Sequence, residues 1–269
     1  LYDMVSEYLQ RPNLYALPNS QRQLITLILR KLLASSTFAI AGALDSLVIR
    51  LKKVLSESRF EGELDDIQSD FEEYEIESEE WEEENSPEIL TLTDKAAIES
   101  EIKELEFFRD AAVTITENAK GNALISALAQ GFKKARELGS EEKAIVFTES
   151  RKTQNYLINL LSENGYRDRI VLFNGTNSDP QSKAIYAKWL EKNKGSDRVS
   201  GSKTADMRTA LVDKFRETAQ IMIATEAGAE GINLQFCSMV VNYDLPWNPQ
   251  RIEQRIGRCH RYGQKHDVV

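Results

Sequence analysis

The chain has 269 residues, of which 41% are hydrophobic, enough for one large domain or two smaller domains with a real core. No apolar run approaches the length of a membrane span and no signal-peptide pattern opens the sequence, so we expect a cytoplasmic protein without a membrane segment. The formal net charge of −9, taken as an average, argues against a nucleic-acid partner.

The acidic charge, however, is concentrated in one stretch. Residues 61–88 hold 15 of the 43 acidic residues and contain neither Lys nor Arg. The other 28 acidic residues are outnumbered by 34 Lys and Arg, which gives the rest of the chain a net charge of +6. This larger part of the chain is therefore mildly basic and compatible with a polyanionic partner.

The cysteines and histidines do not form a metal-binding pattern. Cys237 and Cys259 lie outside any CxxC spacing, and His260 and His266 are not part of a cysteine or carboxylate cluster. We therefore expect no metal site, and we expect the two thiols to be buried and reduced.

Helical periodicity dominates the first half of the chain. Apolar residues recur every three or four positions in five segments that are almost free of glycine and proline. We expect a helix in each of these segments, which are residues 1–10, 24–32, 37–55, 93–119 and 122–138.

The acidic stretch between these helices, residues 61–90, is poor in apolar residues and is expected to be disordered or loosely attached. One interpretation is a mimic of nucleic-acid charge that occupies a basic groove and inhibits the protein. The other is a solvated linker, which is the commoner role of a charge run.

After residue 140 the pattern alternates between strands and helices. Four short apolar runs, residues 143–148, 170–173, 221–224 and 239–243, are typical of buried strands. Helical segments separate them, so right-handed crossovers predict a parallel sheet. The residues that follow the strands should line one edge, where such sheets bind ligands: Thr148, Gly175, Thr225 and Asp244.

Residues 177–202 interrupt this alternation as a polar insertion that contains Trp189. We interpret Trp189 either as a contact for a partner or as the centre of a small local core. The sequence Gly201-Ser-Lys-Thr resembles the end of a phosphate-binding loop, but the Gly-Lys pair is missing and no strand precedes it.

Two features near the end of the chain indicate chemistry. The loop Thr225–Asn233 is rich in small residues, which lets backbone amides approach a phosphate or a sugar. In the following helix, Gln254, Arg258 and Arg261 share one stripe. Two guanidiniums one turn apart suit a polyanion whose charge changes during a reaction, although a solvated basic face is the alternative. The opposite stripe is expected to pack on the sheet and consists of Ile252, Ile256 and Cys259.

These segments resemble the last motifs of superfamily-two helicases, in the version carried by Swi/Snf-type DNA translocases. Thr225-Glu-Ala-Gly-Ala-Glu-Gly-Ile-Asn-Leu is similar to the fifth motif of that family, and Gln254-Arg-Ile-Gly-Arg-Cys-His-Arg-Tyr-Gly-Gln is similar to its sixth. Asp244-Leu-Pro-Trp-Asn-Pro is similar to the link between them. Within the family, the chain resembles the bacterial branch of RNA-polymerase-associated translocases.

The resemblance implies an α/β fold with a RecA-like parallel sheet flanked by helices, preceded by an all-helical brace region. Residues 1–60 would be a helical brace or linker to a first motor lobe, and residues 61–90 the acidic insert. Residues 91–119 would be a connecting helix, and residues 120–269 a truncated second RecA-like lobe.

Two motifs of a phosphoryl-transfer motor are absent from this sequence: a Gly-x-x-x-x-Gly-Lys-Ser/Thr phosphate loop and an acidic Asp-Glu box after a strand. The resemblance places both in a first lobe ahead of Leu1, and that lobe would also hold most of the Mg²⁺ ligands. We therefore expect a fragment of a larger ATP hydrolase that is inactive by itself.

The resemblance also assigns roles to residues. Arg258 and Arg261 would act as arginine fingers on the γ-phosphate of ATP, Gly231 and Glu230 would lie near the nucleotide, and Gln254 would couple the site to the lobe interface. Contacts with the DNA backbone are expected from Thr148, Ser150, Arg151, Gly175, Thr225 and Trp247. A strand-end cap is the alternative role of Thr225, and a lid on the core that of Trp247.

The implied function is the second motor lobe of an ATP-dependent double-stranded DNA translocase or remodeller that uses ATP with Mg²⁺. Its partners would be the DNA backbone, the first RecA-like lobe of the same protein, and RNA polymerase or another protein complex at the bacterial nucleoid. Two alternatives stay open. One is a helicase that separates DNA or RNA strands, and the other is a non-catalytic RecA-like interaction module.

Overall fold

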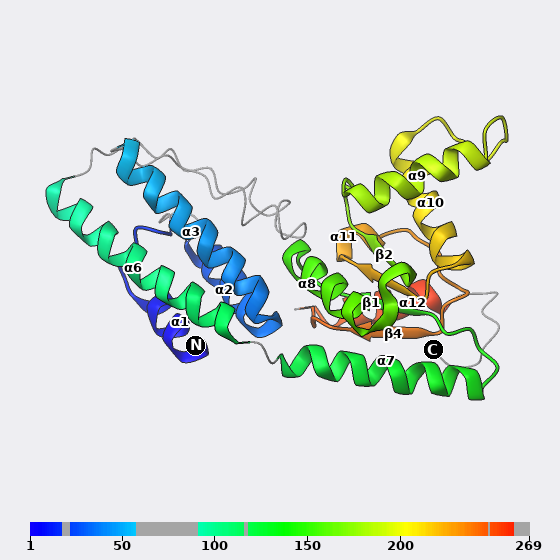
Figure 1. Cartoon of the computed structure of the whole chain (residues 1–269), viewed down its shortest axis with the longest axis horizontal. Helices are drawn as coiled ribbons and strands as arrows, with labels where there is room; N and C mark the ends of the chain where they lie inside the picture. The colour runs from blue at the N-terminus through cyan, green and yellow to red at the C-terminus, as the bar shows by residue number, and fades with distance from the viewer. Residues whose placement is uncertain (18–21, 58–90, 116–117, 247, 261–269) are drawn as a thin grey trace. The chain divides into compact units, whose positions relative to one another are not determined.

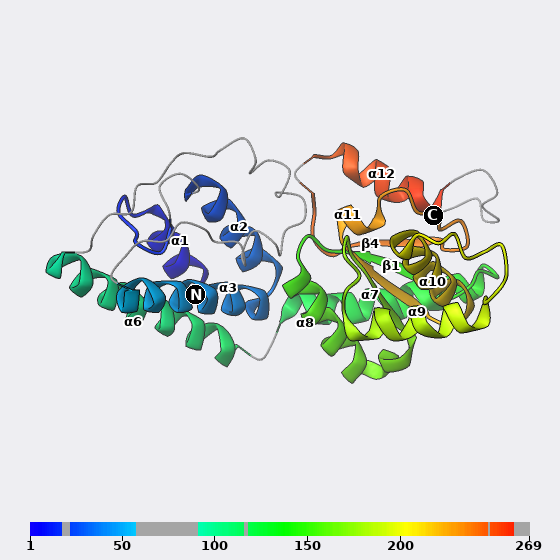
Figure 2. The same ribbon diagram turned by 90° about the horizontal axis from the view of Figure 1, so that it is seen from above.

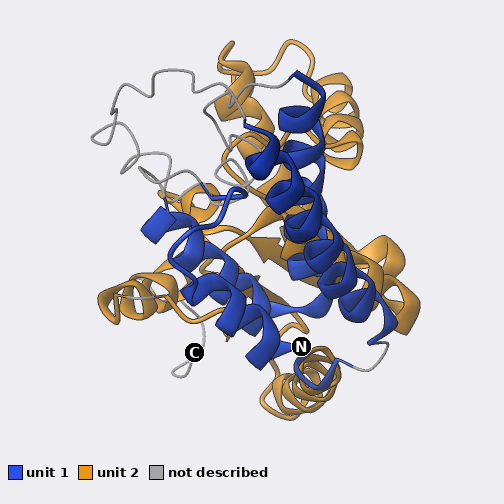
Figure 3. Ribbon diagram, turned by 90° about the vertical axis from the view of Figure 1, so that its left-hand side faces the viewer, with its two compact units in different colours: residues 1–120 blue, residues 121–269 orange. Residues whose placement is uncertain are grey.

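The computed structural model describes residues 1–17, 22–57, 91–115, 118–246 and 248–260. Contacts divide the chain into two units, Leu1–Lys120 and Gly121–Val269 (Figure 3). The expectations for the acidic stretch 61–90, for Trp247 and for Arg261 lie outside the described residues.

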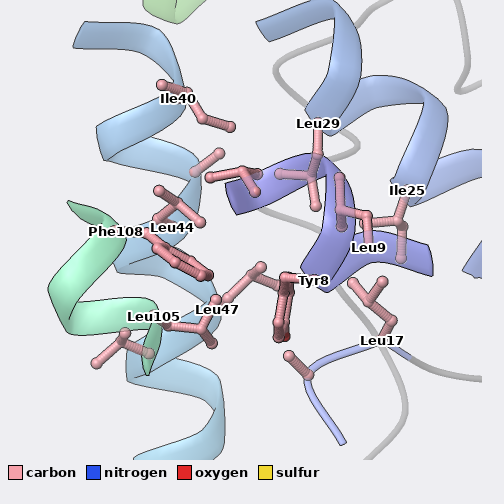
Figure 4. Close-up of a cluster of buried hydrophobic side chains, with 14 of the residues drawn as sticks. Tyr8, Leu9, Leu17, Ile25, Leu29, Ile40, Leu44, Leu47, Leu105 and Phe108 are labelled. Carbon is pink, nitrogen blue, oxygen red and sulfur yellow. The ribbon is translucent and has the colours of Figure 1, made fainter. Parts of the chain in front are cut away.

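The described part of the first unit consists of four helices and the loops between them: α1 (Tyr2–Gln10), α2 (Arg22–Ser35), α3 (Thr37–Glu57) and α6 (Leu92–Thr114) (Figure 1). Each of them coincides with a segment that the helical spacing predicts. Their apolar faces meet in one core, in which Tyr8, Leu44 and Phe108 are buried (Figure 4). The rings of Tyr8 and Phe108 meet edge-on, with centroids 5.8 Å apart.

A buried carboxylate ties this core to the loop that follows α1. Glu101 accepts hydrogen bonds from the Tyr8 hydroxyl at 2.6 Å and from the backbone N–H groups of Tyr15 and Ala16 at 2.9 Å and 3.1 Å. Nη1 of Arg50 donates to the carbonyls of the same two loop residues, both at 2.9 Å. Burial, and next the negative charge of Glu101, raise the pKa of the Tyr8 phenol. Hydrogen bonds from both α3 and α6 thus fix the loop.

The second unit is organised around a parallel sheet. Its strands β1 (Ala144–Phe147), β2 (Ile170–Phe173), β3 (Ile221–Ala224) and β4 (Met239–Asn242) lie in the order β2-β3-β1-β4. Ala144 pairs with Ile221 and with Met239, and Ile170 also pairs with Ile221. The strands β1, β2 and β3 are buried along their whole length, which explains why they read as unbroken apolar runs.

Helices cover both faces of this sheet. α7 (Ala119–Glu137) and α8 (Arg151–Leu161) pack on the face that contains Val146. α10 (Lys203–Glu217) and α12 (Gln250–Cys259) pack on the face that contains Phe147. Figure 2 shows α8 and α12 on opposite sides of the strands. The expected α/β class, a parallel sheet flanked by helices and preceded by a helical region, is confirmed.

The polar insertion forms a helix, α9 (Pro180–Lys192), which packs against α10 through a buried tryptophan. Trp189 is 6% exposed, and its Nε1–H donates to the buried carboxylate of Asp213 at 2.8 Å. Arg198 and Arg216 bind the same carboxylate at 2.5 Å and 3.2 Å. Of the two interpretations of Trp189, the structure supports the small local core. Within the described ranges, no helix has the length and apolar character to cross a membrane.

Candidate functional site

The carboxyl ends of the strands form one edge of the second unit. Phe147, Phe173, Ala224 and Asn242 occupy the same level of the sheet, because each is paired in register with its neighbours. The strand tips that the alternation predicts at one edge therefore do come together there. They are Thr148, Gly175, Thr225 and Asp244.

A carboxylate joins the end of β1 to the end of β4. Thr148 is fully buried, and its hydroxyl donates to Oδ2 of Asp244 at 2.6 Å. The backbone N–H of Glu149 donates to the same oxygen at 3.2 Å. Asp244 therefore fixes the turn from β1 into α8. The side chain of Thr148, which we predict to face DNA, is bonded inside the protein.

The N-terminus of α8 also lies at this edge. Ser150 caps the helix, since its Oγ accepts from the N–H of Thr153 at 3.0 Å and donates to the Thr153 hydroxyl at 2.9 Å. Ser150 is buried, whereas Arg151 in the first turn is half-buried. The positive end of the α8 dipole and the guanidinium of Arg151 therefore lie close together, an arrangement that favours binding of a phosphate group.

The loop after β2 is held by two asparagines. Oδ1 of Asn177 accepts from the N–H of Asn174 at 2.8 Å, and Oδ1 of Asn174 accepts from the N–H of Asn177 at 2.7 Å. Both asparagines are buried, while Gly175 is exposed at the tip between them. The loop thus presents the predicted contact residue Gly175 to solvent on a backbone that side chains hold in place.

The loop after β3 begins with a short helix, α11 (Glu226–Ala229). Oγ1 of Thr225 caps it by accepting from the N–H of Gly228 at 3.3 Å, and Thr225 is 1% exposed. Thr225 therefore has the strand-end role that we considered as its alternative. A Cβ on Gly228 would lie 2.6 Å from Cα of Asn174 and 2.8 Å from the carbonyl oxygen of Phe173, so only glycine fits at this position.

The predicted nucleotide residues Glu230 and Gly231 follow α11 and are both exposed. Gly231 has φ of +75°, and no atom lies within 4 Å of the place that a Cβ would occupy. The carbonyl of Glu230 accepts a hydrogen bond from Arg208, whose guanidinium also stacks on the ring of Phe173 at 5.2 Å. The sequence did not single out Arg208, because a charged residue in α10 looks like any solvent-facing residue of a helix.

Arg258, the predicted arginine finger, lies near Arg208. Burial lowers the pKa of the Arg208 guanidinium, Glu230 raises it, and the positive charge of Arg258 lowers it further. Arg258 is half-buried, and its side chain makes no hydrogen bond or ion pair to another residue in the described parts of the chain. Arg208 thus borders the open glycine loop, and Arg258 is near enough for its charge to act on Arg208, which makes this a suitable place for a polyanion.

The face with which α12 packs differs from the expected one. We predicted that Ile252, Ile256 and Cys259 face the sheet. Cys259 is buried and Ile252 is half-buried, but Ile256 is 39% exposed, and Arg255 is fully buried in its place. Gln254, the predicted coupling residue, is exposed. Arg255 stands three residues after Ile252 and four before Cys259, so its position on the packing face is the signal that could have revealed a buried guanidinium.

Arg255 can be buried because acceptors surround it. Nε donates to the Glu226 carboxylate at 2.7 Å, and Nη1 donates to Oδ1 of Asn242 at 2.8 Å and to the Asp244 carbonyl at 2.9 Å. The guanidinium also stacks on the ring of Phe147, 4.8 Å from its centroid. The helix therefore turns Arg255, rather than Ile256, toward the ends of the strands.

The two cysteines are buried near each other. A hydrogen bond with Cys237, and next burial, raise the pKa of the Cys259 thiol. Both are free thiols. Among the described residues, no group of three or more His, Cys, Asp or Glu is arranged as a metal site.

Part of the second unit is similar to a known protein family. Residues 152–263 match the family model of the helicase conserved C-terminal domain. This stretch includes α8 from its second residue, the loop Thr225–Asn233 and α12.

Two bacterial proteins illustrate the similarity in sequence. The chain is 44% identical over 128 residues to the uncharacterized ATP-dependent helicase YqhH of Bacillus subtilis, covering 48% of this chain and 18% of YqhH. It is 54% identical over 63 residues to the RNA polymerase-associated protein RapA of Erwinia tasmaniensis, covering 23% of this chain and 6% of RapA. The aligned stretches thus span less than a fifth of either relative.

A solved structure with a similar arrangement is the crystal structure of the C-terminal part of the Fun30 ATPase domain. The two chains are 17% identical, with a TM-score of 0.40, and the match covers 99% of this chain and 77% of that one.

Proposed function

We propose that this chain, whose residues 152–263 carry a helicase conserved C-terminal domain, supplies the second motor lobe of an ATP-dependent double-stranded DNA translocase. One observation carries the proposal. Arg258 in α12 is half-buried and its side chain has no acidic partner among the described residues, and its carbonyl accepts from the N–H of Leu234, three residues after Gly231 in the open loop.

The described residues fit one side of an ATP site. Arg258 would bind the γ-phosphate and stabilise the charge that develops there, and Arg261 would be the second finger on the same helix. Gly231 allows close approach because its φ is positive and the space beside it is open, and Glu230 would meet the ribose or a bridging water. Gln254, exposed on α12, would contact the first lobe.

ATP with Mg²⁺ would supply the phosphoanhydride bond whose hydrolysis drives movement. The phosphate loop and the acidic box that such hydrolysis needs are not part of this sequence, so the first lobe would contribute them together with most metal ligands. Closure of the two lobes around ATP, and their release after hydrolysis, would move the DNA.

The DNA backbone would lie against the loops at the carboxyl edge. The N-terminus of α8 with Ser150 and Arg151, and the exposed loop at Gly175, offer backbone N–H groups and one guanidinium to phosphates. Contacts of this kind do not read bases, so binding should be nearly independent of sequence and strongly dependent on salt. A relative that is named for its association with RNA polymerase suggests that polymerase, or another complex in the bacterial cytoplasm, is a further partner.

The nucleic-acid preference of the ATPase tests this proposal. In the full-length protein, we expect duplex DNA to raise ATP turnover more than a single strand of the same length, and added salt to abolish the difference. Arg151→Ala should weaken the stimulation by duplex DNA. Arg167→Ala, an exposed arginine just before β2 at the opposite edge of the sheet, should leave it unchanged.

Other outcomes would identify the alternatives. Stimulation by single strands together with displacement of a labelled strand would indicate a strand-separating helicase. An absence of ATP turnover under all conditions would indicate a non-catalytic module and would contradict the proposal.

A further inference from the structure

Arg255 is a buried cation whose partners come from three strand ends. It is 0% exposed, and its bonds reach Glu226 in α11, which follows β3, and Asn242 and Asp244 at the end of β4. Its planar face covers the ring of Phe147, the last residue of β1. One side chain of α12 therefore touches the ends of β1, β3 and β4.

These partners lead to both halves of the proposed site. Glu226 begins α11, and the chain leaves this helix at Glu230 and Gly231 on the nucleotide side. Asp244 binds the Thr148 hydroxyl and the Glu149 N–H, and the chain then reaches the cap of α8 at Ser150 on the DNA side. Arg255 therefore connects the nucleotide loop at Gly231 with the cap of α8 at Ser150, and it belongs to the same helix as Arg258.

Stability alone does not explain a buried arginine here. A buried ion pair contributes little net stability compared with a well-packed apolar side chain of similar size, because both charges lose their hydration. Nη2 of Arg255 is buried and has no hydrogen-bond partner in the described structure, which is a further cost. What the guanidinium provides, and an apolar residue or lysine does not, is a rigid fork that holds several acceptors in fixed directions.

We infer that Arg255 is a positioning residue that couples the nucleotide loop to the DNA-facing loops of this edge; the inference rests on the proposed function. When Arg258 engages a phosphate, α12 is held against the nucleotide. A shift of α12 is then transmitted through the hydrogen bonds of Arg255. On one side it reaches Glu226, and on the other it reaches Asp244, which binds Thr148 at the start of the turn into α8. Because these contacts are buried and directional, they move as a unit, and loss of Arg255 separates DNA binding from ATP turnover.

The test uses the full-length protein with Arg255→Met, Arg255→Lys, Glu226→Ala and Asn242→Ala. For each folded variant, ATP turnover is measured with and without duplex DNA, together with KM for ATP and the DNA concentration that gives half-maximal stimulation. We expect Arg255→Met to lower the DNA-stimulated turnover by about 10- to 100-fold while KM for ATP is unchanged. Arg255→Lys should restore only part of it, since an ammonium keeps the charge near Glu226 but not the fork.

The outcomes separate the inference from the proposed function. A folded Arg255→Met variant with the wild-type ratio of DNA-stimulated to DNA-free turnover, even with a lower melting temperature, would show a purely structural role and overturn the inference. Should Arg255→Met fail to fold, Glu226→Ala and Asn242→Ala each remove one acceptor of the fork, and unchanged ratios in both would overturn it equally. A wild-type protein without any DNA stimulation would refute the proposed function, and this inference with it.

Discussion

Each unit of this protein contains a buried charged side chain at the centre of a hub of hydrogen bonds, Glu101 in the first unit and Arg255 in the second, and the two hubs differ in where their contacts lead. In the first unit, Glu101 accepts from three donors, and Arg50 donates to carbonyls of the same loop, although its buried Nε has no partner among the described residues. In the second unit, Arg255 leaves Nη2 without a partner among the described residues, and its contacts lead to exposed loops. A hub whose contacts stay within one core favours a role in stability, whereas a hub whose contacts reach exposed loops indicates a role in function.

Glu101→Leu should have the largest effect on stability. The substitution leaves the Tyr8 hydroxyl and two buried N–H groups without an acceptor, so we expect the free energy of unfolding to fall by about 3 kcal/mol or more. Glu104→Leu on the same helix is the matched control, because it removes only the exposed pair with Arg11, worth about 1 kcal/mol or less. Denaturant unfolding of both variants measures the difference, and equal losses would mean that the Glu101 network does not hold the first unit together.

Gly228→Ala should have the next largest effect, and it acts in the second unit. The added methyl group would meet the backbone of Phe173 and Asn174, which cannot move aside as a flexible side chain would. We expect a loss of about 2 kcal/mol. The control is Gly257→Ala in α12, where no atom lies within 4 Å of the new Cβ, and where alanine should stabilise the helix by about 1 kcal/mol. A neutral Gly228→Ala would show that the loops after β2 and β3 are not in close contact.

The architecture could be predicted from the sequence because buried residues recur at the spacing of each helix or strand. The helices α1, α3 and α6 bury residues at helical spacing, and the strands β1 to β3 are short apolar runs because helices cover both faces of the sheet. Since parallel strands end at one edge, the tips at Thr148 and Thr225 could be placed together before the structure was known.

The sequence did not predict the polar interior of that edge. Arg255 and Arg208 look like surface residues in a helical pattern, because the groups that accept their hydrogen bonds, at Glu226, Asn242 and Glu230, belong to other segments. Ile256 was assigned to the packing face by its spacing, yet stacking on Phe147 and three hydrogen bonds favour Arg255 there. The spacing of residues in one helix cannot reveal hydrogen-bond acceptors that other segments of the chain supply.

The measurement that tests the central claim most directly is ATP turnover by the full-length protein carrying Arg258→Ala or Arg261→Ala, with Arg167→Ala as the control on the opposite edge of the sheet. If the two arginines complete a nucleotide site from this lobe, each variant should lower DNA-stimulated kcat by about 1000-fold while the control keeps wild-type turnover. Turnover by Arg258→Ala within about twofold of the wild type would contradict the account.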